Sequence, residues 1–205
     1  MHVLMLNPPF HSRYSRSQRS PAVIKSGVIY YPIWLAYATG VLEQSGFTVN
    51  LLDAPAAGCD LPDVLQITEE FAPRLVVIDT STPSIYNDIE VAEALKSRIP
   101  HAFVLLVGPH VTALPEESLS ISPAIDAVAR GECDYTVRDA AGVLAGGGDL
   151  STVAGLSYRD SSGTIVHNQD RPPIQDLDAL PFVSEVYRRH LQIEDYFYSI
   201  ARYPE

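Results

Sequence analysis

The stretch that decides the fold is Leu75–Pro83, which reads LVVIDTSTP. Its first four residues are all apolar, which is typical of a strand buried on both faces of a parallel sheet. Polar residues end this strand at Asp79. Pro83 suits the first turn of a helix, where its missing N–H would have no helical partner in any case. The stretch therefore predicts a strand, a polar loop and a helix in succession.

The same unit recurs along the first 150 residues. Short apolar runs predict five strands, at Val3–Leu6, Thr48–Leu52, Leu75–Ile78, Phe103–Val107 and Ile125–Ala129. Apolar residues at helical spacing predict helices over about 34–45, 61–71, 85–99, 115–120 and 134–144, and Trp34 belongs to the buried stripe of the first. Such units, joined by right-handed crossovers, form a doubly wound α/β fold. We expect a Rossmann-like, flavodoxin-like sheet of five parallel strands in the order 2-1-3-4-5.

Residues after 150 follow a different pattern. Val153–Tyr158 and Thr164–His167 flank the turn-forming sequence DSSG and predict a β-hairpin. An extended, proline-containing linker follows. We therefore divide the chain into an α/β domain (1–150), a hairpin with linker (151–183) and the start of a connection to a further domain (184–205).

Composition limits the kinds of protein that this chain can be. Of its 205 residues, 46% are hydrophobic and 19% charged, which fits a compact domain and not a disordered chain. No apolar run reaches 18 residues, so we expect no transmembrane segment. A formal net charge of −11 argues against nucleic acid as a partner. Cys59 and Cys133 stand too far apart for a metal knuckle, and together with the lack of a signal peptide they indicate reduced thiols and a cytoplasmic location.

The positive charges are placed unevenly. No acidic residue precedes Glu43, whereas Arg13, Arg16, Arg19 and Lys25 all lie in this first part of the chain. One interpretation of the basic loop, residues 11–30, is a solvated loop. The other is a contact for phosphate or carboxylate groups, or for another domain.

The candidate site lies where the strands end. Open α/β sheets bind ligands beyond the carboxyl ends of their strands, so the loops of interest are Asn7–Phe10, Thr80–Ser84, Gly108–Val111 and Arg130–Cys133. The first loop lacks the glycines of a dinucleotide site, which argues against classical NAD or FAD binding. Asp79 resembles the acceptor of a receiver domain, but the first loop also lacks the carboxylates that would hold Mg²⁺. We expect no catalytic residue and no metal ligand set in this chain.

These loops carry a family resemblance. LNPP, TSTPS, VGPHVTALPEESL and RGECDYTV, followed by GLSYRDSSGTIVHN and DLDALPF, resemble the N-terminal cobalamin-binding domain of radical S-adenosylmethionine (SAM) enzymes. YYPIWLAYATG, SPAIDAVARGE and VYRRHLQIEDYFYSIARYP are most similar to the hopanoid-biosynthesis-associated member. The anaerobic magnesium-protoporphyrin monomethyl ester cyclases resemble the chain more distantly.

The resemblance implies a cobalamin site and a missing catalytic domain. The implied cofactor-binding residues are Pro8, Pro9, Thr80, Ser81, Thr82, Pro83, Gly108, Pro109, His110, Gly131 and Glu132. Tyr31 and Trp34 are further candidates for a wall of the corrin. No histidine has an aspartate two residues before it, so we expect base-off cobalamin without a protein histidine on cobalt. The 4Fe–4S cluster and SAM belong to a radical SAM barrel beyond this chain, which is the implied partner; the fragment alone is not catalytic.

Two alternatives remain open. The domain could be a cofactor-free scaffold of the same family, in which side chains fill the crevice at the strand ends or the loop at 11–30 closes it. It could also be a stand-alone flavodoxin-like regulatory domain.

Overall fold

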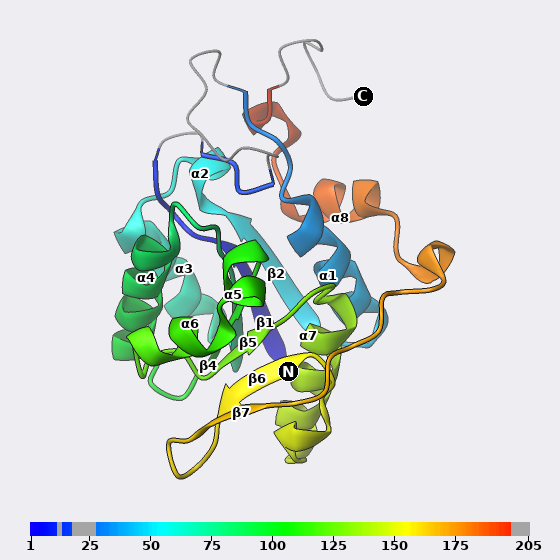
Figure 1. The fold of residues 1–205 in the computed structure, drawn as a ribbon. Coiled ribbons are helices and arrows are strands. Elements are labelled where there is room, and N and C mark those ends of the chain that lie inside the picture. The colour runs from blue at the N-terminus through cyan, green and yellow to red at the C-terminus, as the bar shows by residue number, and fades with distance from the viewer. Residues whose placement is uncertain (12–13, 18–27, 198–205) are drawn as a thin grey trace.

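The computed structural model describes residues 1–11, 14–17 and 28–197, and in them one sheet lies between two layers of helices (Figure 1). The strands are β1 (His2–Asn7), β2 (Thr48–Asp53), β3 (Leu75–Asp79), β4 (Phe103–Val107), β5 (Ala127–Ala129), β6 (Leu156–Arg159) and β7 (Ile165–His167). The α-helices are α1 (Ile33–Gln44), α2 (Ala54–Ala57), α3 (Leu61–Phe71), α4 (Ile85–Arg98), α5 (Pro109–Ala113), α6 (Pro115–Ile121), α7 (Asp134–Gly146) and α8 (Val183–His190). Short 3-10 helices lie at Leu150–Thr152, Leu177–Ala179 and Ile193–Asp195.

The described strands form one sheet in the order β2-β1-β3-β4-β5-β6-β7. The first five are parallel, as predicted, with Val3 of β1 opposite Val49 on one side and Leu75 on the other. The five parallel strands stand in the predicted order, but the predicted hairpin is part of the same sheet, which therefore has more strands than expected. The hairpin β6–β7 pairs antiparallel with β5, where Ala129 lies opposite Leu156, and so extends the sheet to seven strands. It supplies hydrogen-bond partners to an edge that would otherwise be open.

Side chains of alternate residues along each strand enter two separate cores. Val77 points to the face covered by α1 and α7, and Ile78 points to the face covered by α3, α4 and α6. Both residues are fully buried. Burial on both faces explains why the strands read as unbroken apolar runs.

Most helices begin and end where the pattern predicts. Two short helices, α2 and α5, were not predicted, because five residues or fewer show no helical periodicity. Trp34 does not belong to the buried stripe of α1, since 63% of its surface is exposed. The helix α4 begins at Ile85 and not at Pro83, which lies in the turn before it.

The C-terminal segment packs back onto the domain. Pro181 lies against α1 at Gly40, where a Cβ atom would come within 2.4 Å of the proline Cγ. The ring of Tyr31 is stacked between those of Tyr187 and Tyr196, with centroid distances of 4.2 and 4.1 Å. Among the described helices, none is long and apolar enough to cross a membrane.

Candidate functional site

The carboxyl ends of β1, β3, β4 and β5 bring the four predicted loops to one edge of the sheet. In the sheet, β1 lies between β2 and β3. The chain passes from β1 to β2 on one side and then to β3 on the other, so the strand order reverses between β1 and β3. The edge has two parts with different properties: the crevice between β1 and β3, and the surface over β3, β4 and β5.

Arg16 fills the crevice between β1 and β3. Its Nη2 lies 2.5 Å from Oδ1 of Asp88 on α4, and the two side chains are 1% and 0% exposed. Its Nη1 donates to Oδ1 of Asn7 at 2.6 Å and to the carbonyl oxygen of Pro8 at 2.8 Å. Its Nε donates to Oγ of Ser84 at 3.2 Å. Each nitrogen of the guanidinium group is therefore bonded inside the protein.

The network continues to β2 and the C-terminal segment. Asn7 donates from Nδ2 to Oδ1 of Asp53 at 2.7 Å, and the hydroxyl of Tyr196 donates to Oδ2 of Asp53 at 2.8 Å. Burial raises the pKa of Asp53 to about 6, although both hydrogen bonds oppose this shift. Tyr196 is itself buried, so this hydrogen bond lies inside the protein.

A second branch of the network holds the loop after β3. The hydroxyls of Tyr14 and Ser81 lie 2.9 Å apart, and those of Ser81 and Ser84 lie 2.8 Å apart. Ser84 also donates to Oδ2 of Asp88 at 2.7 Å. The hydroxyl of Ser81, a predicted cofactor contact, is thus engaged within the chain.

Neither interpretation of the basic loop describes Arg16. The side chain is not solvated, and the carboxylate that it binds belongs to the same chain. The other basic residues of that loop, Arg13, Arg19 and Lys25, lie outside the described residues.

The glycine after β4 serves internal packing. Gly108 has φ +118°, and a Cβ atom there would lie 2.2 Å from the carbonyl oxygen of Thr80. Thr80 is itself buried and donates from Oγ1 to the carbonyl oxygen of Val107 at 2.7 Å. The close approach that requires glycine is therefore between two loops of the chain.

The surface over β3, β4 and β5 is open. Thr82, Pro83 and Pro109 are exposed. Gly131 has φ +69°, and a Cβ atom there would meet nothing within 4 Å, so its backbone faces open space. His110 is 8% exposed; its Nδ1 lies 3.4 Å from Oγ1 of Thr82, and its buried Nε2 has no hydrogen-bond partner. An unsatisfied buried nitrogen at a ligand-binding edge is a candidate contact for a ligand.

The other predicted residues differ in their surroundings. Pro8 is buried and Pro9 is half-buried at the end of β1. Glu132 accepts a hydrogen bond from the backbone N–H of Ile174 at 2.6 Å and so holds the linker. Tyr31 is packed between two tyrosines, whereas Trp34 remains available to a ligand.

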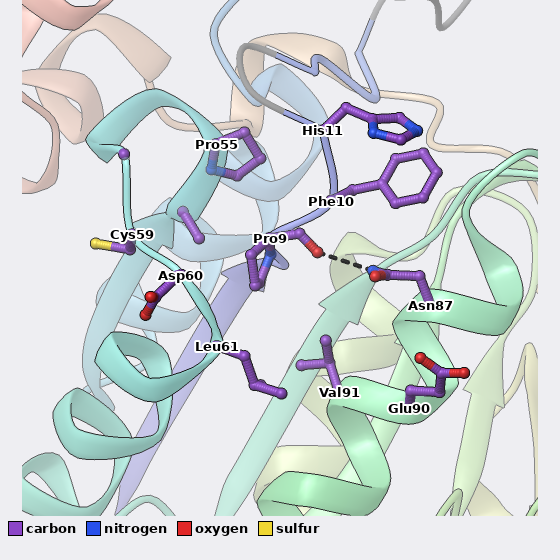
Figure 2. Close-up of a pocket in the computed structure, with 12 residues that line it drawn as sticks. Pro9, Phe10, His11, Pro55, Cys59, Asp60, Leu61, Asn87, Glu90 and Val91 are labelled. Carbon is purple, nitrogen blue, oxygen red and sulfur yellow. Dashed lines mark hydrogen bonds between the residues drawn. The ribbon is translucent and has the colours of Figure 1, made fainter.

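A cavity of about 370 Å³ opens beside the crevice, between the α2–α3 turn and α4 (Figure 2). Pro9, Phe10 and Pro55 form part of its wall, and Asn87 donates from Nδ2 to the carbonyl oxygen of Pro9 at 2.8 Å. Of the residues predicted to bind cofactor, Pro9 alone lines it. The volume is at the lower limit for a small ligand and too small for a corrin.

Asp79 is a buried carboxyl group at the end of β3. Burial raises its pKa to about 7, and the nearby Asp88 acts in the same direction, whereas Arg16 opposes it. Burial also raises the pKa of the Cys133 thiol, so this cysteine is not an activated nucleophile. Within the described residues, no group of three or more His, Cys, Asp or Glu side chains could hold a metal ion.

Sequence reasoning missed Asp88, Asp53 and Tyr196, and it named Arg16 only as one of the basic residues of its loop. One signal for Asp88 was available, because it lies on the stripe of α4 that Ile85, Ile89 and Ala92 bury. A carboxylate on an apolar face predicts a buried partner. Nothing local identified that partner, which is 72 positions away.

The fold and this edge define a Rossmann-like ligand-binding domain. Comparison with known proteins gives the class of ligand: the B12 binding domain model matches residues 19–141. The chain belongs to the B12 binding domain family.

Relatives of this chain include much longer proteins. An uncharacterized methyltransferase of Pyrococcus horikoshii, PH0819, is 32% identical over 184 residues, which are 90% of this chain and 38% of the relative. An anaerobic magnesium-protoporphyrin IX monomethyl ester cyclase of Rubrivivax gelatinosus is 29% identical over 184 residues, 88% of this chain and 32% of that protein. The chain thus spans about a third of the length of these relatives.

A solved structure has the same fold. The cobalamin-dependent SAM radical enzyme OxsB, with aqua-cobalamin and SAM bound, superposes with a TM-score of 0.68 at 17% identity. The match covers 84% of this chain and 22% of OxsB.

The surface over β3, β4 and β5 fits a cobalamin better than the crevice does. It offers exposed Thr82, the orphaned Nε2 of His110 and the open space at Gly131. In the crevice, all three guanidinium nitrogens of Arg16 already donate within the chain, and 1% of its side chain is exposed.

Proposed function

We propose that this chain is the cobalamin-binding module of a cobalamin-dependent radical SAM enzyme, and that it holds the cofactor over β3, β4 and β5. The family match over residues 19–141 carries the proposal. The open backbone at Gly131 and the unsatisfied Nε2 of His110 support this part of the edge as the binding surface.

The residues of this chain bind and orient the cofactor. Thr82 and His110 are the hydrogen-bonding groups, Gly131 admits close approach, and Trp34 offers an exposed aromatic face. Bound cobalamin supplies the cobalt chemistry, carriage of a methyl group or of electrons. No histidine of the chain has an aspartate two residues before it, so we keep the prediction of a base-off cofactor without a histidine on cobalt.

The rest of the enzyme is also a proposal. A radical SAM barrel with its 4Fe–4S cluster and SAM would follow this chain and be its main partner. The proposal is supported by relatives that are named as a methyltransferase and a cyclase, and by the likeness to OxsB, which is named as a cobalamin-dependent SAM radical enzyme. A role in hopanoid or related isoprenoid or tetrapyrrole metabolism and a cytoplasmic location remain predictions.

One observation favours a second candidate function. Tyr14 and Arg16 fill the crevice between β1 and β3, as expected for a cofactor-free scaffold closed by the loop at 11–30. This candidate predicts the same fold without uptake of cobalamin.

The test is uptake of hydroxocobalamin. The purified chain is mixed with the cofactor and desalted, and the visible spectrum of the protein peak is recorded. A stoichiometric spectrum of the base-off form supports the proposed function. A colourless peak favours the scaffold.

A pair of glycines provides a matched control. Gly131 and Gly147 have φ +69° and +70°, and a Cβ atom on either would meet nothing within 4 Å. Gly147 caps α7 at the opposite edge of the sheet. Each change to alanine should reduce stability by roughly 1–2 kcal/mol because the backbone is left-handed. We expect Gly131→Ala alone to weaken cobalamin binding, and equal effects of both would argue against the proposed surface.

A further inference from the structure

Arg16 joins the two loops that flank the switch in strand order. Asn7 and Pro8 belong to the end of β1, Ser84 to the turn after β3, and Asp88 to the first turn of α4. Open α/β sheets bind ligands between these loops. In this chain a guanidinium group occupies that position.

The burial of this ion pair opposes withdrawal of Arg16. Removing the guanidinium would leave Asp88 buried near Asp79, a second buried carboxyl group that is itself close enough to interact with the buried Asp53. Loss of one partner from a buried ion pair is strongly destabilising, because the remaining charge has neither water nor a counter-ion. The hydrogen bonds to Asn7 and Pro8 would be lost as well.

The hydrogen bonds of Arg16 also argue against a role in binding a phosphate group of a ligand. Its Nε, Nη1 and Nη2 all donate to oxygens of the chain, and 1% of the side chain is exposed. An arginine that binds phosphate needs N–H groups of its guanidinium directed toward the ligand.

We propose that Arg16 seals the crevice between β1 and β3 in both the free and the loaded protein, and thereby confines a bound cobalamin to the edge formed by β3, β4 and β5. The identity of the ligand as cobalamin rests on the proposed function. The closure of the crevice by Arg16 does not rest on it. Its bonds join the loops after β1 and β3, and all of those described are to groups of the chain itself.

The test is arginine modification of the intact chain by phenylglyoxal, mapped by peptide mass spectrometry with and without hydroxocobalamin. Arg98 and Arg189 have side chains that are 56% and 49% exposed and serve as reactive controls. We expect both controls to react and Arg16 to stay unmodified in the two states.

Other results overturn the proposal in distinct ways. Reaction of Arg16 in the free protein means that the crevice is open. Reaction only after cobalamin is added means that Arg16 is a plug displaced by the cofactor. If the chain takes up no cobalamin, the proposed function fails, while the free protein still decides whether Arg16 is sealed.

A double variant separates sealing from contact with the cofactor. Arg16→Met with Asp88→Leu removes both buried charges together, which proteins tolerate far better than the loss of one. We expect its Kd for hydroxocobalamin to stay within about twofold of the parent value. A roughly tenfold weaker Kd would show that Arg16 holds the cofactor, and a tenfold tighter one that it obstructs binding.

Discussion

Tyr196 donates its hydroxyl to Oδ2 of Asp53 over 2.8 Å, although 143 positions separate the two residues. The bond connects the C-terminal segment to the end of β2, and Asn7 connects the same carboxyl group to Arg16 in the crevice. A short antiparallel bridge between Ile29 and Phe197 lies beside it. The last described residues are therefore tied to the carboxyl end of β2 and, through Asn7, to the crevice that Arg16 fills.

Tyr196→Phe should reduce stability more at pH 8 than at pH 5. The pKa of Asp53 in the folded protein is about 6, above its ordinary 3.8, so the folded state loses stability as pH rises through this range. The tyrosine hydroxyl limits that loss by stabilising the carboxylate. Without it a buried charge lacks a donor, which costs about 1–3 kcal/mol. Urea denaturation at both pH values measures the difference, and exposed Tyr86→Phe is the control.

Asp79→Asn should stabilise the protein above pH 7. The folded-state pKa of about 7 lies above the ordinary 3.8, so the protonated carboxyl stabilises the folded state at low pH and that contribution is lost as pH rises to 7. A pKa difference of one corresponds to about 1.4 kcal/mol. We expect a gain of a few kcal/mol at pH 8 that disappears near pH 4. Exposed Asp178→Asn should change neither value, and a loss at pH 8 would mean that the Asp79 carboxylate is stabilised where it lies.

The order of the parallel strands could be predicted because it follows from local signals. Apolar runs such as Phe103–Val107 identify buried strands, and the handedness of crossovers limits their order. The antiparallel pairing of β6 with β5 could not be predicted, because the sequence of a hairpin does not specify which edge of a sheet it extends. The helix α5 could not be predicted either, because its sequence, PHVTA, is too short to show a periodic pattern.

The site was less predictable than the fold. The loops that carry Thr82, His110 and Gly131 follow from the strand ends, because parallel strands finish at one edge. The ion pair of Arg16 with Asp88 depends on tertiary packing alone. A basic loop rich in serine has the composition of a solvated segment, so the burial of Arg16 has no signature in the sequence.

Gly40→Ala should loosen the C-terminal segment from the domain. Alanine favours a helix over glycine by about 1 kcal/mol, but its Cβ atom would lie 2.4 Å from Cγ of the rigid Pro181 ring. We expect faster hydrogen exchange over residues 181–197, with little change in β1 and β3. Gly142→Ala in α7 is the matched control, because no atom lies within 4 Å of its added Cβ and it should only gain stability. Equal exchange in the two variants would show that this packing can adjust.

His110→Leu should separate binding from stability. The buried Nε2 without a partner destabilises the folded chain by about 1–3 kcal/mol, so an apolar side chain of similar size should maintain or raise the melting temperature. If that nitrogen serves the ligand, the same change should weaken hydroxocobalamin binding by roughly tenfold, the effect of one hydrogen bond. The measurements are a thermal melt and a binding titration of the same preparation. A lower melting temperature with unchanged affinity would mean that His110 is a packing residue and that the cofactor is held by other groups on this edge.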